Sequence, residues 1–166
     1  MRFEHVAVHH RTSDFSCGSK DLDDWLKHHA LDNETRRLSR TYVLLDDDNE
    51  LVGYYSLTMG GVPRQALPSS YGERSPNYER GMVLIARLAV NSSRQGRGFG
   101  RDLLVDAIDR SVVAANEVAA QFISVDPIDE SARAFYTHFG FRSVEGDTEG
   151  RMFVRVDEAI EALLGD

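Results

Sequence analysis

The chain has 166 residues, of which 42% are hydrophobic and 28% charged, ordinary proportions for one globular domain. Its 27 acidic residues against 19 Lys and Arg give a formal net charge of −8, which argues against indiscriminate nucleic-acid binding. The sequence has no apolar run near the roughly 20 residues that span a bilayer, no signal-peptide pattern, and only Cys17 for a disulfide or thiolate zinc site. A membrane protein, a disulfide-stapled secreted domain and a cysteine zinc finger are thereby excluded, and a cytoplasmic protein is predicted.

The N-terminal half predicts a strand, a helix and a hairpin. Residues 3–8 alternate weakly, as an edge strand does. Asp21 is predicted to cap a helix whose apolar residues recur at helical spacing. Strands at 42–45 and 51–57 flank the acidic run 46–50, which is most simply a solvated hairpin turn.

The C-terminal half alternates strands with helices. Residues 60–81 form a long irregular connection, of a kind that is often functional. Further elements are a buried strand at 82–90 interrupted by Arg87, an amphipathic helix over 101–112, a strand at 122–125, a helix begun by Asp126-Pro127 and ended by Gly140, a strand at 152–156 and a closing helix. This order predicts a mixed α/β sandwich with a central sheet.

A glycine-rich turn joins the buried strand to the long helix. It contains Gly96, Gly98 and Gly100 and is rimmed by Arg94, Arg97 and Arg101. The first amides of a helix have no internal partners, and the helix dipole favours negative charge there. Glycines let an anion approach the main chain, and arginines add positive charge. The turn therefore predicts a diphosphate site, with a ligand-free connector as the alternative.

Two common phosphate motifs are excluded at this turn. A nucleoside-triphosphate loop needs lysine and then serine or threonine where Arg101-Asp102 stands. The dinucleotide fingerprint needs a third glycine where Arg101 stands.

Three segments resemble the GNAT superfamily of acetyl-CoA-dependent N-acetyltransferases. Residues 95–100, Gln-Gly-Arg-Gly-Phe-Gly, are similar to its Gln/Arg-x-x-Gly-x-Gly/Ala signature. Residues 86–90, Ala-Arg-Leu-Ala-Val, resemble its fourth strand, and 132–141 its second signature, an aromatic helix followed by Gly-Phe. The resemblance implies a single GNAT domain over 1–166, with a central mixed, mostly antiparallel sheet flanked by helices, and acetyl-CoA as cosubstrate.

The resemblance also implies roles for individual residues. The coenzyme would be held, chiefly through the main chain, by Leu88, Ala89, Val90, Arg94, Gln95, Gly96, Arg97, Gly98, Phe99, Gly100 and Asp129. Tyr136 falls on the family's general acid, which protonates the leaving thiolate. A phenol of pKa near 10 can protonate a thiolate whose conjugate acid has a pKa of about 8.5. The alternative for Tyr136 is core packing beside Phe135 with its hydroxyl bound to backbone, and that for Asp129 is helix capping alone.

Other chemistry-bearing residues give weaker signals. The side chains of His9-His10 and His28-His29 are expected to diverge, so no metal site is predicted. Cys17 has no evident activating base, which disfavours a nucleophile.

Segments in the N-terminal third narrow the resemblance to GNAT-type toxins of bacterial toxin–antitoxin pairs. These segments are 15–18, 22–26, 40–43 and 53–57. Such toxins acetylate the α-amine of aminoacyl-tRNA, block translation, and are neutralised by a small DNA-binding antitoxin of the ribbon-helix-helix type; many relatives are dimers. An α-amine, of pKa near 8, is partly neutral at pH 7, whereas a lysine amine near 10.4 needs a strong base. Because the fourth strand has no glutamate, the sequence favours an α-amine acceptor.

A local basic patch would be needed to hold tRNA on this acidic protein. The predicted acceptor residues are Arg36, Arg37, Arg40 and Arg87, extended by Arg94 and Arg97 and by Arg64, Arg74 and Arg80 of the long connection. Two other functions stay open: a metabolic N-acetyltransferase for a small-molecule or peptide amine, with 60–81 as a lid, and a non-catalytic GNAT-fold binding module.

Overall fold

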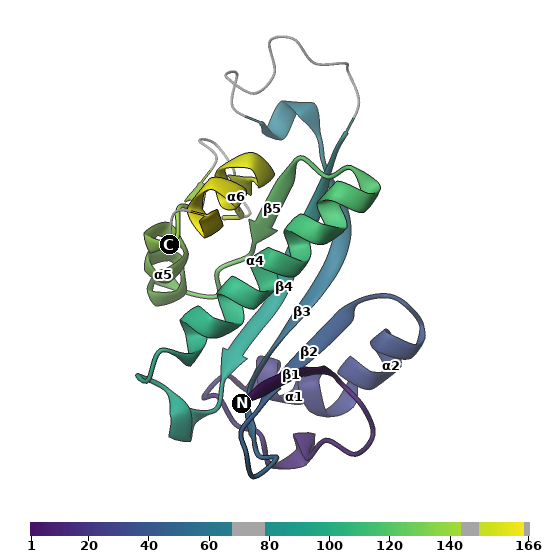
Figure 1. The fold of residues 1–166 in the computed structure, drawn as a ribbon, viewed down its shortest axis with the longest axis vertical. Helices are drawn as coiled ribbons and strands as arrows, with labels where there is room; N and C mark the ends of the chain where they lie inside the picture. Colours follow the sequence, from purple (N-terminus) through teal and green to yellow (C-terminus); the bar gives the residue numbers. More distant parts are fainter. Residues whose placement is uncertain (68–78, 144–149, 165–166) are drawn as a thin grey trace. The chain divides into compact units, whose positions relative to one another are not determined.

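The computed structural model describes residues 1–67, 79–143 and 150–164 (Figure 1). The strands are β1 (Arg2–His5), β2 (Arg40–Leu45), β3 (Leu51–Val62), β4 (Arg80–Val90), β5 (Phe122–Val125), β6 (Arg142–Ser143) and β7 (Met152–Arg155). The α-helices are α1 (Lys20–His28), α2 (Ala30–Thr35), α4 (Phe99–Val118), α5 (Glu130–His138) and α6 (Val156–Leu164), and the 3-10 helices are η1 (Thr12–Asp14), η2 (Arg64–Ala66) and η3 (Ser92–Arg94). In the described part of the chain, no helix is both long and apolar enough to cross a membrane.

The sheet within these residues has seven strands in the order β1-β2-β3-β4-β5-β7-β6. β1 and β2 pair antiparallel, as do β2 and β3. β4 and β5 pair parallel, whereas β7 is antiparallel to both β5 and β6. The predicted fold class, a mixed and mostly antiparallel sheet accompanied by helices, is confirmed.

The chain divides into two compact units. The first comprises Met1–Thr58 and Ala86–Ala107, and the second comprises Met59–Ile85 and Ile108–Asp166. β3, β4 and α4 each contribute residues to both units. The glycine-rich turn belongs to the first unit and Tyr136 to the second.

The core of the first unit is built around Tyr54, whose exposed fraction is 0%. Its ring meets Phe15 edge-on at 5.4 Å and stacks on Trp25 of α1 at 6.0 Å between centroids. Its hydroxyl donates a hydrogen bond of 2.7 Å to the Leu22 carbonyl, which satisfies the buried polar group. The apolar residues of α1 thus dock the helix on β3.

Gly53, also on β3, lets α4 and β4 approach closely. A Cβ atom at this position would lie 2.7 Å from the Ala89 carbonyl oxygen and 2.7 Å from Leu103 Cδ1. Any larger residue at 53 would therefore have to displace the main chain of β4 at Ala89 and the Leu103 side chain of α4.

The core of the second unit gathers apolar residues from four strands, β3, β4, β5 and β7. Val62, Met82 and Phe122 are buried together, and Phe153 meets Phe122 edge-on at 6.1 Å. β5 is buried along its whole length, as its apolar sequence predicts.

Several predicted boundaries are wrong. α5 begins at Glu130 with Asp129 as its N-cap, not at Asp126-Pro127. Ser19, not Asp21, is the N-cap residue of α1, and Asp21 lies in the first turn. The irregular connection is shorter than predicted, because β3 continues to Val62 and β4 starts at Arg80. Residues 68–78 of that connection lie outside the described residues.

Candidate active site

The turn between β4 and α4 presents its main chain outward. Gly96 and Gly98 have φ of +75° and +88°, and nothing lies within 4 Å of a Cβ built on either. The amides of Gly96, Arg97 and Gly98 donate no hydrogen bond to any residue in the described ranges. Unpartnered amides on a left-handed glycine turn at the start of a helix suit a diphosphate.

The Gln95 side chain holds this turn in place. Its Nε2 donates to the Cys17 carbonyl at 2.8 Å and to the Val90 carbonyl at 3.0 Å. The Ser92 amide donates to the Ser16 carbonyl at 2.8 Å. The turn is therefore anchored to residues 16–17. Because the Gln95 side-chain amide is used in this anchor, its main chain is the part that can contact a ligand.

Arg94 is paired with a carboxylate of the acidic hairpin. Its Nη2 lies 2.5 Å from Asp46 Oδ2, and Asp46 also accepts hydrogen bonds from the Asp48 and Glu50 amides at 3.0 and 2.9 Å. These amides and Arg94 hold the Asp46 pKa below its usual value. Asp46 is only 8% exposed, so the expectation of a solvated turn is wrong for this residue. The Arg94 guanidinium therefore already has a carboxylate partner, and the pair ties the turn to the hairpin.

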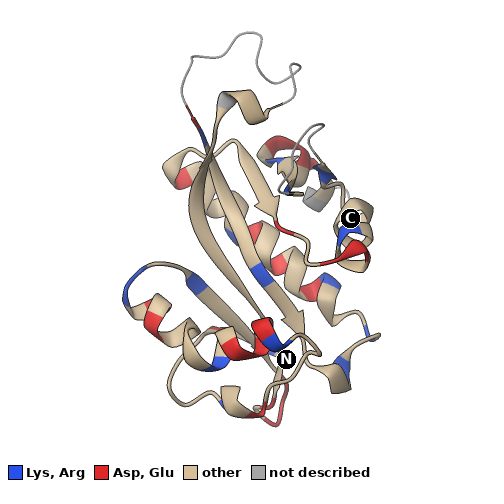
Figure 2. Ribbon diagram, turned by 180° about the vertical axis from the view of Figure 1, so that it is seen from behind, with Lys and Arg blue, Asp and Glu red and all other residues tan. Residues whose placement is uncertain are grey.

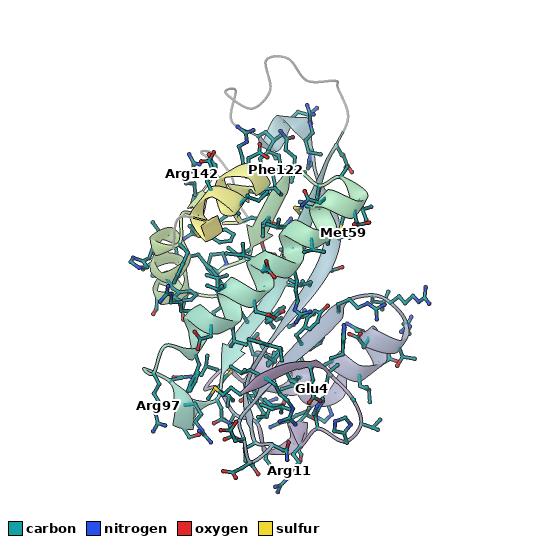
Figure 3. The ribbon with its side chains drawn as sticks, in the orientation of Figure 1. Glu4, Arg11, Met59, Arg97, Phe122 and Arg142 are labelled. Atoms are coloured by element: carbon teal, nitrogen blue, oxygen red, sulfur yellow. The ribbon has the colours of Figure 1, made fainter. Side chains whose placement is uncertain are left out.

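Arg97 is an exposed cation of this turn. Its side chain is exposed and points away from the ribbon (Figure 3). Within the described residues it has no carboxylate partner, so its guanidinium is available to an anion.

The predicted acyl-arm residues lie at the end of β4. Ala89 is buried in the core with Trp25 and Tyr54, whereas Leu88 and Val90 are only half-buried. Because the Ala89 side chain faces the core, this residue can offer a ligand only its main chain.

Tyr136 lies on α5 in the second unit. It is 7% exposed and meets the rings of Phe135 and Phe141 at 5.3 and 5.7 Å. Burial, and secondarily the charge of Asp126, raise the pKa of Tyr136 to about 12. No hydrogen-bond partner of its hydroxyl lies among the described residues, so the backbone-bound hydroxyl of the packing alternative is not found there.

Asp129 caps α5. Its Oδ1 accepts a 2.7 Å hydrogen bond from the Ala132 amide, as an N-cap side chain does. Of the two roles predicted for Asp129, helix capping and cofactor binding, the observed contact corresponds to capping.

The arginines proposed for the acceptor differ in their partners. Arg36 lies 3.4 Å from Asp32, and Arg40 lies 2.8 Å from Glu34. Basic and acidic residues both occur along α1, whereas α2 carries only acidic ones and Arg36 and Arg37 follow its end (Figure 2). Arg37 is exposed with φ of +59°, and it has no carboxylate partner within the described ranges.

Arg87 has an aromatic partner. Its guanidinium carbon lies 4.2 Å from the centroid of the Trp25 ring. The remaining arginines of the long connection add little: Arg74 and the side chain of Arg64 lie outside the described residues, and Arg80 is half-buried at the start of β4.

A histidine–carboxylate cluster near the N-terminus was not predicted from the sequence. Glu4, His9 and His10 bring their ligand atoms within 4.8 Å, and the two rings, expected to diverge, have centroids 4.2 Å apart. His10 Nδ1 accepts from the Ala7 amide at 2.9 Å, which places the proton of a neutral ring on Nε2, 3.2 Å from Glu4. That tautomer has no lone pair left for a metal ion.

Cys17 is a poor nucleophile. Burial, and secondarily its contact with Asp23, raise its pKa to about 11, which leaves the thiol protonated at neutral pH.

The chain belongs to the acetyltransferase (GNAT) family, which it matches over residues 6–141. It is therefore an acetyltransferase, and acetyl-CoA, whose diphosphate suits the glycine turn, is its acyl donor. A tRNA-acetylating toxin of Mycobacterium tuberculosis (strain ATCC 25618 / H37Rv) is 38% identical over 152 residues, 92% of this chain and 89% of the toxin.

Two solved structures are similar to this chain over nearly its whole length. AtaT complexed with acetyl-methionyl-tRNAfMet has a TM-score of 0.89 and 27% identity, covering 98% of each chain. AtaTR bound with AcCoA has a TM-score of 0.85 and 26% identity, covering 99% of this chain and 98% of the other.

Proposed function

We propose that this chain transfers the acetyl group of acetyl-CoA to the α-amine of aminoacyl-tRNA, and that it thereby stops translation as the toxin of a toxin–antitoxin pair. The observation that carries the proposal is the 38% identity, across nearly the whole chain, to a tRNA-acetylating toxin. The glycine turn and the buried Tyr136 supply the donor side and the acid that the reaction requires.

The main chain positions the donor in this mechanism. Amides of residues 96–98 hold the diphosphate, and the main chain of Leu88 and Val90 pairs with the acyl arm. Asp46 and Gln95 keep the turn in shape through Arg94 and the main chain of residues 16–17. The donor supplies a thioester, whose carbonyl carbon the amine attacks.

Tyr136 is the general acid. As the C–N bond forms and the C–S bond breaks, its hydroxyl donates a proton to the departing thiolate, and the new amide nitrogen releases a proton to solvent. The raised pKa keeps Tyr136 neutral and proton-bearing at working pH.

The acceptor needs no strong base. An α-amine of pKa near 8 is neutral in part at pH 7, unlike a lysine amine. β4 carries no Asp or Glu that would serve as a base. This favours an α-amine over a lysine side chain.

We further propose that residues 1–166 act as one acetyltransferase domain in the cytoplasm, where charged tRNA is found. A small DNA-binding antitoxin of the ribbon-helix-helix type is the proposed partner, and a homodimer the proposed assembly. Sedimentation of the purified chain tests the homodimer, and a short ribbon-helix-helix reading frame beside the gene tests the antitoxin.

Expression in a bacterial host tests the toxin proposal. Induction of the wild-type chain is expected to arrest growth and incorporation of labelled methionine, and Tyr136→Phe is expected to relieve both. Normal growth with folded, abundant wild-type protein would contradict the toxin proposal and would favour a metabolic acetyltransferase.

A further inference from the structure

Arg87 is held against an aromatic surface inside the first unit. It lies on β4, and its guanidinium carbon is 4.2 Å from the centroid of Trp25. Trp25 is itself buried and stacks on Tyr54 with an interplanar angle of 12°. The Tyr54 hydroxyl donates a hydrogen bond to the Leu22 carbonyl, which fixes the Tyr54 ring. The guanidinium therefore lies against a buried pair of stacked rings.

The charge of Arg87 has no counterion. Among residues 1–67, 79–143 and 150–164, no carboxylate pairs with it, in contrast to Arg36, Arg40 and Arg94. Half-burial lowers its pKa, although an arginine stays charged at working pH. The ring face offsets only part of the desolvation cost of a partly buried cation. An arriving anion would complete the coordination of the guanidinium.

The position of Arg87 on β4 indicates which anion. It directly precedes Leu88, whose main chain is proposed to pair with the acyl arm, and neighbouring Cα atoms are about 3.8 Å apart. In an aminoacyl-tRNA the amino acid esterifies the last ribose. The first negative charge met from the amine is the phosphodiester between the last two nucleotides.

We propose that Arg87, backed by Trp25, binds the terminal phosphodiester of the acceptor strand and so aligns the α-amine for transfer. This inference rests on the proposed function and names a contact for it. The planar guanidinium can donate two parallel hydrogen bonds to phosphate oxygens, a geometry that lysine does not offer.

A pair of small acceptors isolates this contact. One is 3′-O-aminoacyl adenosine, which has no phosphate, and the other is the same amino acid on cytidylyl-adenosine, which has one phosphodiester. We expect wild-type kcat/KM to be about tenfold higher for the dinucleotide, in line with a charge-assisted contact. Arg87→Gln is expected to bring the ratio of the two kcat/KM values close to one.

Two further variants control the comparison. Arg11→Gln removes an exposed arginine that pairs with Asp14 and Glu50, and is expected to keep the wild-type ratio. Arg87→Lys keeps the charge and loses the two-donor geometry, so an intermediate ratio is expected; this variant decides the matter if Arg87→Gln does not fold.

The outcomes separate the inference from the proposed function. An equal rate on both acceptors in the wild type, or an unchanged ratio in a folded Arg87→Gln or Arg87→Lys protein, overturns the phosphodiester contact and leaves tRNA acetylation standing. Failure of the wild type to acetylate charged tRNA and both small acceptors overturns the proposed function itself.

Discussion

At the scale of single residues, removal of the Tyr136 hydroxyl tests its proposed catalytic role without disturbing the packing of the ring. The hydroxyl makes no hydrogen bond to any described residue, so Tyr136→Phe removes the proposed acid without removing a hydrogen bond within the described part of the chain. We expect kcat to fall about a hundredfold or more and the free energy of unfolding to change by less than about 0.5 kcal/mol. Steady-state kinetics and urea unfolding measure the two effects.

Tyr55 provides the matched control for that variant. It is also fully buried, but its hydroxyl donates to the Asp106 carboxylate. Tyr55→Phe is expected to lower stability by about 1 kcal/mol and to retain acetyl transfer. A Tyr136→Phe enzyme that turns over like the wild type would remove Tyr136 from the mechanism.

The pH profile follows from the raised pKa of Tyr136. Since a tyrosine donates a proton only below its pKa, a value of about 12 keeps the acid competent throughout the working range. We expect kcat/KM to rise as the acceptor amine deprotonates around pH 8 and then to stay level to about pH 10. An acceptor with an amide in place of the alkali-labile ester allows the measurement. A descending limb centred near pH 10 would mean an unshifted tyrosine.

The same shift has a consequence for stability. A group whose pKa is raised by folding contributes stability below its unfolded value and loses it as the pH rises through its folded value. For Tyr136 the unfolded value is 10.0 and the folded value about 12. This contribution is therefore present at neutral pH and is lost only between these values.

At the scale of elements, the acidic hairpin supports the glycine turn. Asp46→Asn keeps an acceptor for the amides of residues 48 and 50 and removes the charge that holds Arg94. We expect the Kd for acetyl-CoA to rise about threefold to tenfold as the turn loosens. Isothermal titration calorimetry measures it.

Asp47→Asn is the control for Asp46→Asn. Asp47 is exposed and contacts the N-terminal ammonium at 2.7 Å, so its loss is expected to leave the Kd unchanged. Equal affinities for the Asp46→Asn and wild-type proteins would show that the hairpin does not position the turn.

Gly98 tests the shape of the turn itself. Its φ of +88° disfavours any side chain, yet a Cβ there would meet nothing within 4 Å, so only backbone strain separates alanine from glycine. Gly98→Ala is expected to lower stability by about 1 kcal/mol and to weaken acetyl-CoA binding several-fold.

Gly140 supplies the comparison, since it ends α5 with φ of +86° and is equally open. Gly140→Ala is expected to cost similar stability without changing the Kd for acetyl-CoA. If both variants bind acetyl-CoA alike, the left-handed turn is not the diphosphate site.

The sequence predicts the elements whose signal is local. β2, β4, β5 and α4 follow from apolar runs and helical spacing, and the glycine turn from its composition. β6 has only two residues, too few for a periodic pattern. Pro127 indicated an earlier start of α5, but the Asp129 side chain caps the helix instead.

Long-range partners could not be predicted. The sequence predicts that Asp46 is one acid of a solvated turn. In the structure it pairs with Arg94, which is 48 residues away in the chain. In the sequence, Arg87 only interrupts an apolar strand; the structure shows that its guanidinium packs on the Trp25 ring. In each case the contact is a tertiary one, which the local sequence does not encode.

At the scale of the whole molecule, the net charge of −8 has to be reconciled with the proposed tRNA substrate. Arg36, Arg40 and Arg94 are paired with carboxylates, whereas Arg37, Arg87 and Arg97 have no carboxylate partner among the described residues. Because the chain is acidic overall, we expect tRNA binding to depend on individually placed cations, such as the proposed contact of Arg87, rather than on a broad basic face.

The location of the transferred acetyl group tests the central claim most directly. Wild-type protein is incubated with acetyl-CoA carrying a labelled acetyl group and with charged tRNA, and the tRNA is then digested to its terminal aminoacyl-adenosine for mass spectrometry. The label is expected on the α-nitrogen of the amino acid, with none transferred by Tyr136→Phe. Label on lysine side chains or on free small amines, with charged tRNA left unmodified, would contradict the account.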